Sequence, residues 1–443
     1  MPVQRTALFG NINAFAYYFA ELLVGSPPQP VSVIMDTGSA LCGFPCKGCT
    51  HCGHHLDPLF DMKASNTSKM LPCGLGCDQC SFGHCGYRES YTEGSSISGI
   101  WFRDLVLLQP MQVKKPDEVA NTPVVASMGC HRDERKLFYT QKVNGILGLA
   151  PHSITKSSNV LKDLFKAEVN HEIFAICLAE WGGLLTVGGY DADLSVGRLQ
   201  WLPLHHTGYF GVGLQQLSCE EQKVGAPSDF GTTVLDTGTT FTYFPEPVYQ
   251  AMRLALKTHC IGLKCDATAV GDNCWKLQSK TLRFPNVSLA FTNGMGEMHI
   301  PWPAEAYMFR RGEGNVWCYA FASNGMSRET VLGISFFVHK NVVFDTSKSR
   351  LGIAAAHCPE NHYKGPQPVP QTARLEQASA YEKALEDAGP LEGTGTSQHT
   401  VAVVLGSVGA FLLLVAVAMC MCAYSLEEPD EESGQKLALW DTE

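Results

Sequence analysis

The sequence has no excess of basic side chains. It contains 33 Lys and Arg against 43 Asp and Glu, which gives a formal net charge of −10 at pH 7. Nucleic-acid-binding domains usually carry a basic patch, so this balance argues against a nucleic-acid partner. Part of the acidic excess is local, because residues 425–443 hold seven acidic side chains and one Lys, a net charge of −6. Residues 1–424 therefore carry a net charge of −4 and create no strong electrostatic field.

The start of the sequence also lacks the long apolar run of a secretory signal peptide. Residues 15–23 are a poor signal anchor, because this stretch is short and contains Glu21. Residues 14–24 and 31–35 instead have the composition of two strands, with a Gly-Ser-Pro-Pro turn between them. Because the cysteines described next indicate secretion, we expect the printed sequence to lack its true N-terminus.

Cysteine is abundant, with 18 residues in the chain. Sixteen lie before residue 359, and Cys420 and Cys422 lie in a later apolar run. An even number of cysteines on one side of a membrane indicates disulfides and an oxidising compartment. Two N-glycosylation sequons, at Asn66 and Asn286, fit passage through the secretory pathway.

Eight cysteines lie in residues 42–85, where CxxCxxC and CxxC spacings occur together with four histidines. In a cytosolic protein this pattern would indicate a zinc site. In an oxidising compartment it favours a disulfide-linked segment, and the pairing is not determined by sequence. We therefore expect no metal and no other cofactor. Four later cysteines are expected to form further disulfides: Cys260, Cys265, Cys274 and Cys318.

The tripeptide Asp-Thr-Gly occurs twice, at Asp36–Gly38 and at Asp236–Gly238. Each copy follows a short run of β-branched and apolar residues, and each is followed by a hydroxyl residue, Ser39 or Thr239. One such tripeptide arises easily by chance. Two copies in the same context indicate a pair of related loops in an internally duplicated fold.

Two carboxyl groups within hydrogen-bonding reach share one proton, because both cannot ionise easily. Asp36 and Asp236 would then supply a base that activates water and an acid that protonates a peptide carbonyl. The sequence thus predicts peptide-bond hydrolysis without a covalent intermediate. Gly38 and Gly238 are expected to turn the backbone beneath the carboxylates. Thr37 and Thr237 are expected to bind the opposite loop, and Ser39 and Thr239 to orient the carboxylates.

Over about residues 12–358 the chain resembles pepsin-like (A1) aspartic proteases. Besides the two Asp loops, the resemblance includes two apolar, Gly-containing segments at residues 145–150 and 331–337 and a closing hairpin at residues 343–354. It implies an all-β, bilobal fold with a few short helices. The N-terminal lobe would comprise residues 1–195, and the C-terminal lobe residues 196–358.

Residues 87–101 resemble the flap of this family, a β-hairpin that closes over bound peptide. The resemblance makes Tyr91 the flap tyrosine and implies four substrate-binding residues: Tyr91, Glu93, Gly94 and Ser95. Pepsins place a Trp seven residues after the first catalytic Asp, where it binds this tyrosine. Gly43 occupies that position here, so the sequence does not show what holds Tyr91.

The cysteine-rich insertion, residues 42–85, is similar to that of nepenthesin-like proteases, and the run Phe44–His55 is closer still to plasmepsin V-like proteases. That resemblance implies a protease of the endoplasmic reticulum membrane that cuts newly made secretory proteins at Arg-x-Leu motifs. It implies that Glu93 binds the substrate Arg through a carboxylate–guanidinium contact, with Asp57 as a second candidate. Thr92 stands where this family often has a free Cys, so thiol chemistry is not expected in the flap.

Residues 401–424 contain no charged side chain and are long enough to span a bilayer as one helix. Residues 359–400, rich in Pro, Gln, Ala, Glu and Gly, would form a stalk. Residues 425–443 would form an acidic cytosolic tail. Because this tail lacks the usual Lys and Arg excess, the predicted type I orientation rests on the cysteines and the sequons.

The sequence therefore predicts a monomeric aspartic endopeptidase with lumenal lobes and one C-terminal anchor in the endoplasmic reticulum membrane. Its partners would be the membrane and peptide or protein substrates. Alternative locations are the Golgi, an endosomal or vacuolar compartment, and the plasma membrane. Alternative functions are a β-secretase-like sheddase, a general secretory or vacuolar aspartic protease and, least favoured, a non-catalytic peptide-binding protein. A damaged Asp-Thr-Gly motif would mark the last of these, and both copies are intact.

Overall fold

The computed structural model describes residues 3–365, except residues 75–76, 78, 82, 112–120, 152–158, 167–170, 207, 262–263, 295 and 313. By its internal contacts the chain divides into two compact units, residues 1–389 and 390–443. Every feature described below belongs to the first unit. The predicted span at 401–424, the tail and most of the stalk lie outside the described residues. Within the described residues, no helix combines the length and the apolar character needed to cross a membrane.

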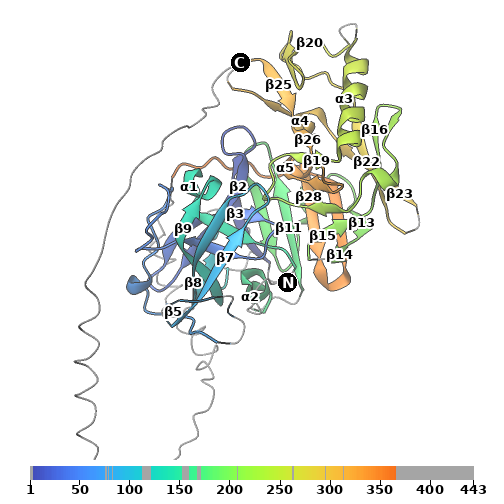
Figure 1. The fold of residues 1–443 in the computed structure, drawn as a ribbon. Coiled ribbons are helices and arrows are strands. Elements are labelled where there is room, and N and C mark those ends of the chain that lie inside the picture. Colours follow the sequence, from blue (N-terminus) through green and yellow to red (C-terminus); the bar gives the residue numbers. More distant parts are fainter. Residues whose placement is uncertain are drawn as a thin grey trace, which may run out of the picture. The chain divides into compact units, whose positions relative to one another are not determined.

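Strands dominate the described part of the chain and form four sheets there (Figure 1). The largest sheet has 15 strands and is built mainly from the first half of the chain. Its strands are β1 (Gln4–Asn11), β2 (Tyr17–Val24), β3 (Gln29–Asp36), β4 (Cys42–Pro45), β5 (Lys69–Met70), β6 (Gln79–Ser81), β7 (His84–Ser90), β8 (Ser96–Leu108), β9 (Val124–Arg135), β10 (Gly145–Gly148), β11 (Ile173–Leu178), β12 (Gly183–Val187), β13 (Gln200–Pro203), β28 (Lys340–Asp345) and β29 (Arg350–Ala355). The hairpin β28–β29 thus returns the end of the fold to the first half of the chain, where β28 pairs with β11.

The second half of the chain builds the three smaller sheets. The six-stranded sheet contains β14 (His205–His206), β15 (Phe210–Val212), β18 (Thr233–Leu235), β19 (Thr242–Phe244), β26 (Phe321–Ser323) and β27 (Thr330–Leu332). One four-stranded sheet contains β16 (Leu214–Cys219), β17 (Gln222–Val224), β22 (Val287–Thr292) and β23 (Glu297–Trp302). The other contains β20 (Ala267–Val270), β21 (Cys274–Leu277), β24 (Met308–Arg310) and β25 (Val316–Tyr319).

Most helices in the described residues are short. They are α1 (Leu137–Thr140), α2 (Val160–Lys166), α3 (Glu246–Cys260), α4 (Ala304–Tyr307) and α5 (Ile334–Phe337), together with 3₁₀ turns at Met62–Ala64, Ala192–Leu194, Pro227–Asp229 and Thr346–Lys348. The apolar residues Val248, Met252, Leu254 and Leu256 in this stretch of the sequence predict one buried helix face, and this is wrong for Leu254, whose side chain is 64% exposed. Leu254 is two residues from both Met252 and Leu256, which are buried, and two residues turn a helix by about 200°.

The internal duplication predicted from the two Asp loops is visible in the strand pairing. β3 runs parallel to β10, with Gly148 opposite Asp36. β18 runs parallel to β27, with Leu332 opposite Leu235. Each Asp loop is therefore supported by the apolar segment that the sequence assigned to it, and the β-rich, bilobal pepsin-like fold is confirmed. The lobe boundary at residues 195 and 196 stays a prediction.

One large buried core extends through sheets from both halves of the chain, and it includes Met35, Leu235, Trp302 and Phe344. A smaller cluster lies where the β7–β8 hairpin packs against β9, β10 and α1. Its buried members are Leu41, Cys85, Tyr87, Ile97, Trp101, Phe138 and Ile146. Tyr91 packs against this second cluster from the hairpin tip. The apolar support of the predicted flap is thus separate from the main core.

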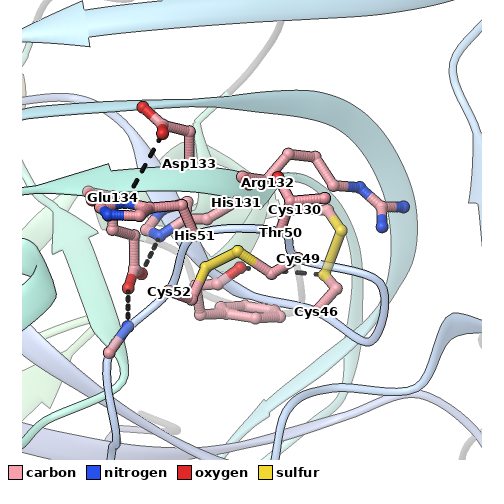
Figure 2. Close-up of a disulfide and its surroundings, with 12 residues drawn as sticks. Cys46, Cys49, Thr50, His51, Cys52, Cys130, His131, Arg132, Asp133 and Glu134 are labelled. Atoms are coloured by element: carbon pink, nitrogen blue, oxygen red, sulfur yellow. Dashed lines mark hydrogen bonds and ion pairs between the residues drawn. A yellow bond between two sulfur atoms is a disulfide. The ribbon is translucent and has the colours of Figure 1, made fainter.

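The disulfide interpretation of the cysteines is confirmed. The described residues contain seven disulfides: Cys46–Cys130, Cys49–Cys52, Cys73–Cys80, Cys77–Cys85, Cys177–Cys358, Cys260–Cys265 and Cys274–Cys318. Cys42 and Cys219 are buried thiols outside these pairs. One bridge of the insertion reaches beyond it, because Cys46 is bonded to Cys130 on β9 (Figure 2).

Both predicted glycosylation sites lie on the surface. Asn66 and Asn286 are exposed, and their backbones are held by hydrogen bonds: the Asn66 N–H donates to Ser26 O at 2.7 Å, and the Asn286 N–H donates to a Glu220 carboxylate oxygen at 2.8 Å while its carbonyl accepts from the Glu220 N–H at 2.8 Å. Their side chains are therefore accessible to a glycosylating enzyme, and the modification itself stays a prediction.

Candidate active site

The two Asp-Thr-Gly loops hold each other through their threonines. The Thr37 N–H donates to Thr237 Oγ1 at 3.1 Å, and the Thr237 N–H donates to Thr37 Oγ1 at 3.0 Å. The Thr37 hydroxyl donates to Leu235 O at 2.9 Å, and the Thr237 hydroxyl donates to Met35 O at 2.8 Å. These four buried hydrogen bonds, called the threonine clamp below, join the loops symmetrically, as expected from the sequence.

The glycines of the two loops bring each backbone against the opposite carboxylate. A Cβ placed on Gly38 would lie 2.5 Å from Asp236 Oδ1, and a Cβ on Gly238 would collide with Asp36 Oδ1 in the same way. A side chain at either position would displace a carboxylate, so glycine is required. The N–H of each glycine donates to the Asp of its own loop, at 2.8 Å in both loops.

Hydroxyl groups orient the outer carboxylate oxygens. Ser39 Oγ donates to Asp36 Oδ2, and Thr239 Oγ1 donates to Asp236 Oδ2 at 2.5 Å.

Burial raises the pKa of Asp36 well above its ordinary value and the nearby charge of Asp236 raises it further, whereas the hydrogen bond from Ser39 lowers it. Burial and the nearby Asp236 charge therefore favour the protonated form of Asp36.

Replacing Ser39 with Ala is expected to move the alkaline limb of the kcat/KM profile to higher pH. The Ser39 hydroxyl stabilises the ionised form of Asp36, so its removal raises the pKa of Asp36 further and preserves the shared proton at higher pH. Measuring kcat/KM against pH on one peptide substrate checks this shift. The exposed Thr281→Ala variant serves as the control with an unchanged profile. A limb that stays in place or moves to lower pH would contradict the proton assignment.

The predicted flap is observed as the β7–β8 hairpin, in which Ser90 pairs with Ser96. Two backbone hydrogen bonds close its tip, from Tyr91 N–H to Ser95 O at 2.9 Å and from Gly94 N–H to Tyr91 O at 2.8 Å. Gly94 has a φ of 85°, a backbone conformation that residues other than glycine rarely adopt. The Gly in the predicted flap motif is therefore required by the turn itself.

Tyr91 is held by Phe138 of α1. The two ring centroids lie 4.9 Å apart. The Tyr91 hydroxyl is buried and meets hydrogen-bond geometry with none of the described residues. Burial raises its pKa, the negative charge of Asp36 raises it further, and the nearby Ser39 hydroxyl opposes the rise. The charge of Asp36 thus acts on the Tyr91 hydroxyl, and Phe138 supplies an aromatic contact that holds Tyr91 and that the sequence did not show.

The other predicted flap residues occupy different environments. Glu93 is exposed in the turn, and its charge makes a small contribution to the raised pKa of Tyr91. Ser95 is fully buried, and its hydroxyl accepts a hydrogen bond from the Leu137 N–H at 3.2 Å. Ser95 thereby fastens the flap to α1, and substrate contacts of Glu93, Gly94 and Ser95 stay predictions.

Asp57, the second candidate for the substrate Arg, is only 4% exposed. Its Oδ2 accepts a hydrogen bond from the Ser32 N–H on β3 at 2.7 Å, and its N–H donates to Asn144 Oδ1 at 2.9 Å. These bonds tie Asp57 to β3, the strand that carries Asp36, and to the residue that precedes β10. The buried position gives no support to substrate binding by Asp57.

Comparisons with known proteins agree with this geometry. A family model described as eukaryotic aspartyl protease matches residues 17–356. Aspartic protease 5 of Toxoplasma gondii is 32% identical over 414 residues, which cover 81% of this chain and 38% of that protein. Plasmepsin V of Plasmodium falciparum is 26% identical over 457 residues, covering 81% of this chain and 73% of that protein. Aspartic proteinase 39 of Arabidopsis thaliana is 25% identical over 382 residues, covering 79% of this chain and 76% of that protein.

The family match covers well over half of the chain and includes both Asp-Thr-Gly loops, the flap and the supporting strands. The chain spans little more than a third of the Toxoplasma relative and about three quarters of plasmepsin V. The resemblance to pepsin-like proteases and to plasmepsin V, predicted from the motifs, is confirmed. The chain belongs to the eukaryotic aspartyl protease family.

Proposed function

We propose that this chain is a membrane-anchored aspartic endopeptidase of the secretory pathway that cuts proteins at Arg-x-Leu motifs. The observation that carries the catalytic part is the threonine clamp, which holds Asp36 and Asp236 at one site. Family membership and two intact Asp-Thr-Gly loops support the same activity. A non-catalytic peptide-binding role would leave this paired geometry without a purpose.

The geometry supports a direct attack by water. Asp236 accepts a proton from a water molecule as the water oxygen bonds to the substrate carbonyl carbon. Asp36 donates the shared proton to the carbonyl oxygen, which produces a neutral tetrahedral diol. The C–N bond then breaks, the diol collapses to a carboxyl group, and a proton passes to the leaving amine. Tyr91 covers Asp36 during these steps, and a closed flap limits access of bulk water.

The proposed location is the endoplasmic reticulum membrane, with the catalytic unit in the lumen. The seven disulfides and the two exposed sequons support an oxidising compartment. The uncharged residues 401–424 support a single-pass anchor, with residues 359–400 as stalk and 425–443 as cytosolic tail. We propose a monomer with peptide or protein substrates. The similarity to plasmepsin V supports a processing role over a sheddase role.

A peptide library randomised around Arg-x-Leu tests the proposed substrate, with cleavage sites read by mass spectrometry. The detergent-solubilised full chain is expected to cut after Leu only where Arg is present, and Asp36→Ala is the inactive control. Cleavage without a requirement for Arg would preserve the endopeptidase and refute the motif. Absence of cleavage between about pH 4 and 7 by folded, oxidised protein would refute the endopeptidase, since acid–base catalysis requires a titratable pair in its working range.

Replacing Glu93 with Gln is expected to lower kcat/KM on an Arg-x-Leu peptide by about 10- to 100-fold, the value of a charge-assisted hydrogen bond. Glu93 is exposed on the flap turn, where its carboxylate can reach a bound guanidinium. The matched control is the same peptide with citrulline in place of Arg, which retains the shape and lacks the charge. Wild type and Glu93→Gln should cleave the citrulline peptide equally. Equal losses on both peptides would show that Glu93 does not read the Arg charge.

A further inference from the structure

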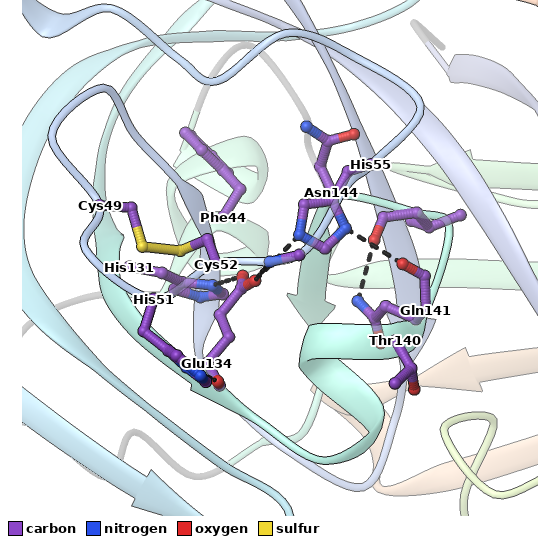
Figure 3. A network of polar contacts seen from close by, with 12 residues as sticks. Phe44, Cys49, His51, Cys52, His55, His131, Glu134, Thr140, Gln141 and Asn144 are labelled. Carbon is purple, nitrogen blue, oxygen red and sulfur yellow. Dashed lines mark hydrogen bonds and ion pairs between the residues drawn. A yellow bond between two sulfur atoms is a disulfide. The ribbon is translucent and has the colours of Figure 1, made fainter.

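A buried network joins the cysteine-rich insertion to β9, and the proposed water attack uses none of its side chains. Its centre is Glu134 on β9 (Figure 3). Glu134 Oε1 accepts from His131 Nδ1 at 2.8 Å, and Oε2 contacts His55 Nε2 at 2.9 Å and the Gly53 N–H at 3.2 Å. The side chains of His55, His131 and Glu134 are at most 1% exposed. A fully buried carboxylate with this many donors is a built feature of the fold.

The hydrogen-bond partners define the charges in this network. His55 Nδ1 faces the Gln141 carbonyl oxygen at 3.1 Å, and its Nε2 faces the Glu134 carboxylate. Each ring nitrogen of His55 therefore faces a hydrogen-bond acceptor. Burial would raise the pKa of Glu134, but the hydrogen bonds from His131 and His55 outweigh it and lower this pKa. The contact between His55 and the Glu134 carboxylate has the geometry of a buried ion pair, and loss of either side chain leaves the other without this partner.

This ion pair joins two segments that are distant in the sequence. His51 and His55 belong to the loop of residues 46–56, whereas Glu134 lies at the end of β9, directly before α1. His51 Nδ1 donates to the Glu134 backbone carbonyl at 2.8 Å, and its ring stacks on Tyr139 at 4.7 Å between centroids. The loop therefore holds both sides of the β9–α1 turn.

Two disulfides hold the loop in this position (Figure 2). Cys46–Cys130 links the start of the loop to β9, and Cys49–Cys52 closes the turn that precedes His55. Because Cys130 is adjacent to His131, the covalent link and the ion-pair network meet on the same stretch of β9. The CxxCxxC segment thus forms a rigid support for the β9–α1 turn.

The β9–α1 turn, which contacts this loop, leads into α1, and α1 carries Phe138, the side chain that packs against the flap tyrosine. The His131 ring meets Phe138 edge-on, with centroids 6.3 Å apart, and Phe138 packs on Tyr91 at 4.9 Å. The Leu137 N–H bonds to Ser95 at the other side of the flap tip. A continuous path of packed groups therefore runs from Glu134 through Phe138 to Tyr91.

We infer that Glu134 is a positioning residue for the flap, through which the cysteine-rich loop fixes Phe138 and keeps Tyr91 over Asp36. This inference rests on the proposed flap role of Tyr91 and is independent of the proposed Arg-x-Leu specificity. It gives the insertion a task in the reaction without assigning it a contact with substrate.

Two variants interrupt the path at different points. Glu134→Gln removes the buried charge, and Phe138→Leu removes the ring that touches Tyr91. Each variant is expected to raise KM about fivefold and to lower kcat/KM about tenfold. The double variant should lose no more kcat/KM than either single variant, because the effects of residues on one path of contacts are not additive. Lys47→Gln, in the same loop, breaks only an exposed ion pair with Asp61 and should match wild type.

A purely structural role for Glu134 predicts a different pattern. Partial unfolding of Glu134→Gln would lower Vmax and leave KM unchanged. In the double variant, the kcat/KM losses of Glu134→Gln and Phe138→Leu would then multiply. Either result would overturn the inference. If Glu134→Gln does not fold, His55→Gln replaces it, since it removes the imidazole partner of Glu134 and retains a side-chain donor, and the same pattern is expected.

Amide hydrogen exchange of the flap peptide containing residues 91–95 supplies a readout that needs no catalysis. Exchange is expected to be about tenfold faster in Glu134→Gln and Phe138→Leu than in wild type and Lys47→Gln, because the support of the hairpin tip is lost. If the wild-type protein cleaves no peptide but the two variants still exchange faster than it does, the positioning role stands and the proposed protease function is refuted. Unchanged exchange in the folded variants would refute the positioning role whatever the activity.

Discussion

Replacing Asp36 with Asn is expected to lower kcat/KM by about 10⁴-fold, the upper end of what acid–base catalysis contributes. Asn has nearly the same shape but cannot hold and donate the shared proton. Its side-chain oxygen can still accept the hydrogen bond from the Gly38 N–H. Because the substitution also removes a buried acid beside Asp236, the thermal midpoint should stay the same or rise.

The measurement is kcat/KM on one fluorogenic peptide, with thermal denaturation of the same samples. Asp236→Asn should show a comparable loss, since the mechanism needs both carboxyl groups. The control is Asp193→Asn, at an exposed position in a 3₁₀ turn, which should retain wild-type activity. Residual activity of Asp36→Asn within about tenfold of wild type would refute the two-carboxylate mechanism, because a neutral amide supplies no acid.

Replacing Thr37 with Val is expected to lower the free energy of unfolding by about 3 kcal/mol, since it leaves buried polar groups unpaired. The hydroxyl of Thr37 donates to Leu235 O and accepts from the Thr237 N–H, and Val can do neither. Both orphaned groups belong to the loop that carries Asp236. A loss of kcat/KM should accompany the loss of stability, because the two carboxyl groups are no longer held in register.

The symmetry of the clamp makes a second variant informative. Thr237→Val should cost about the same free energy, and the double variant should cost less than the sum, because the two hydroxyls share one hydrogen-bond network. Urea denaturation gives the four free energies, and the exposed Thr281→Val serves as the control. Strict additivity would show that the two threonines act independently and would contradict the clamp.

Much of the fold and site was predictable because it is encoded in short patterns. The two Asp loops each combine an apolar strand, a glycine turn and a hydroxyl residue within a few positions, and the structure brings them together through Thr37 and Thr237. Strands around the Gly-Ser-Pro-Pro turn were likewise predictable from local composition. Apolar spacing misassigns Leu254 of α3, which is apolar but faces solvent.

The sequence by itself determined the family, the two Asp-Thr-Gly loops, the flap hairpin and the presence of disulfides, since each depends on residues close together in the chain or repeated in it. Only the tertiary structure decided which cysteines pair, that Phe138 supports Tyr91 and that burial raises the pKa of Asp36. It alone joined His55 to Glu134, 79 residues away. Pairing, burial and the electrostatics that follow from them depend on distances between remote segments, which arise only when the strands assemble into sheets.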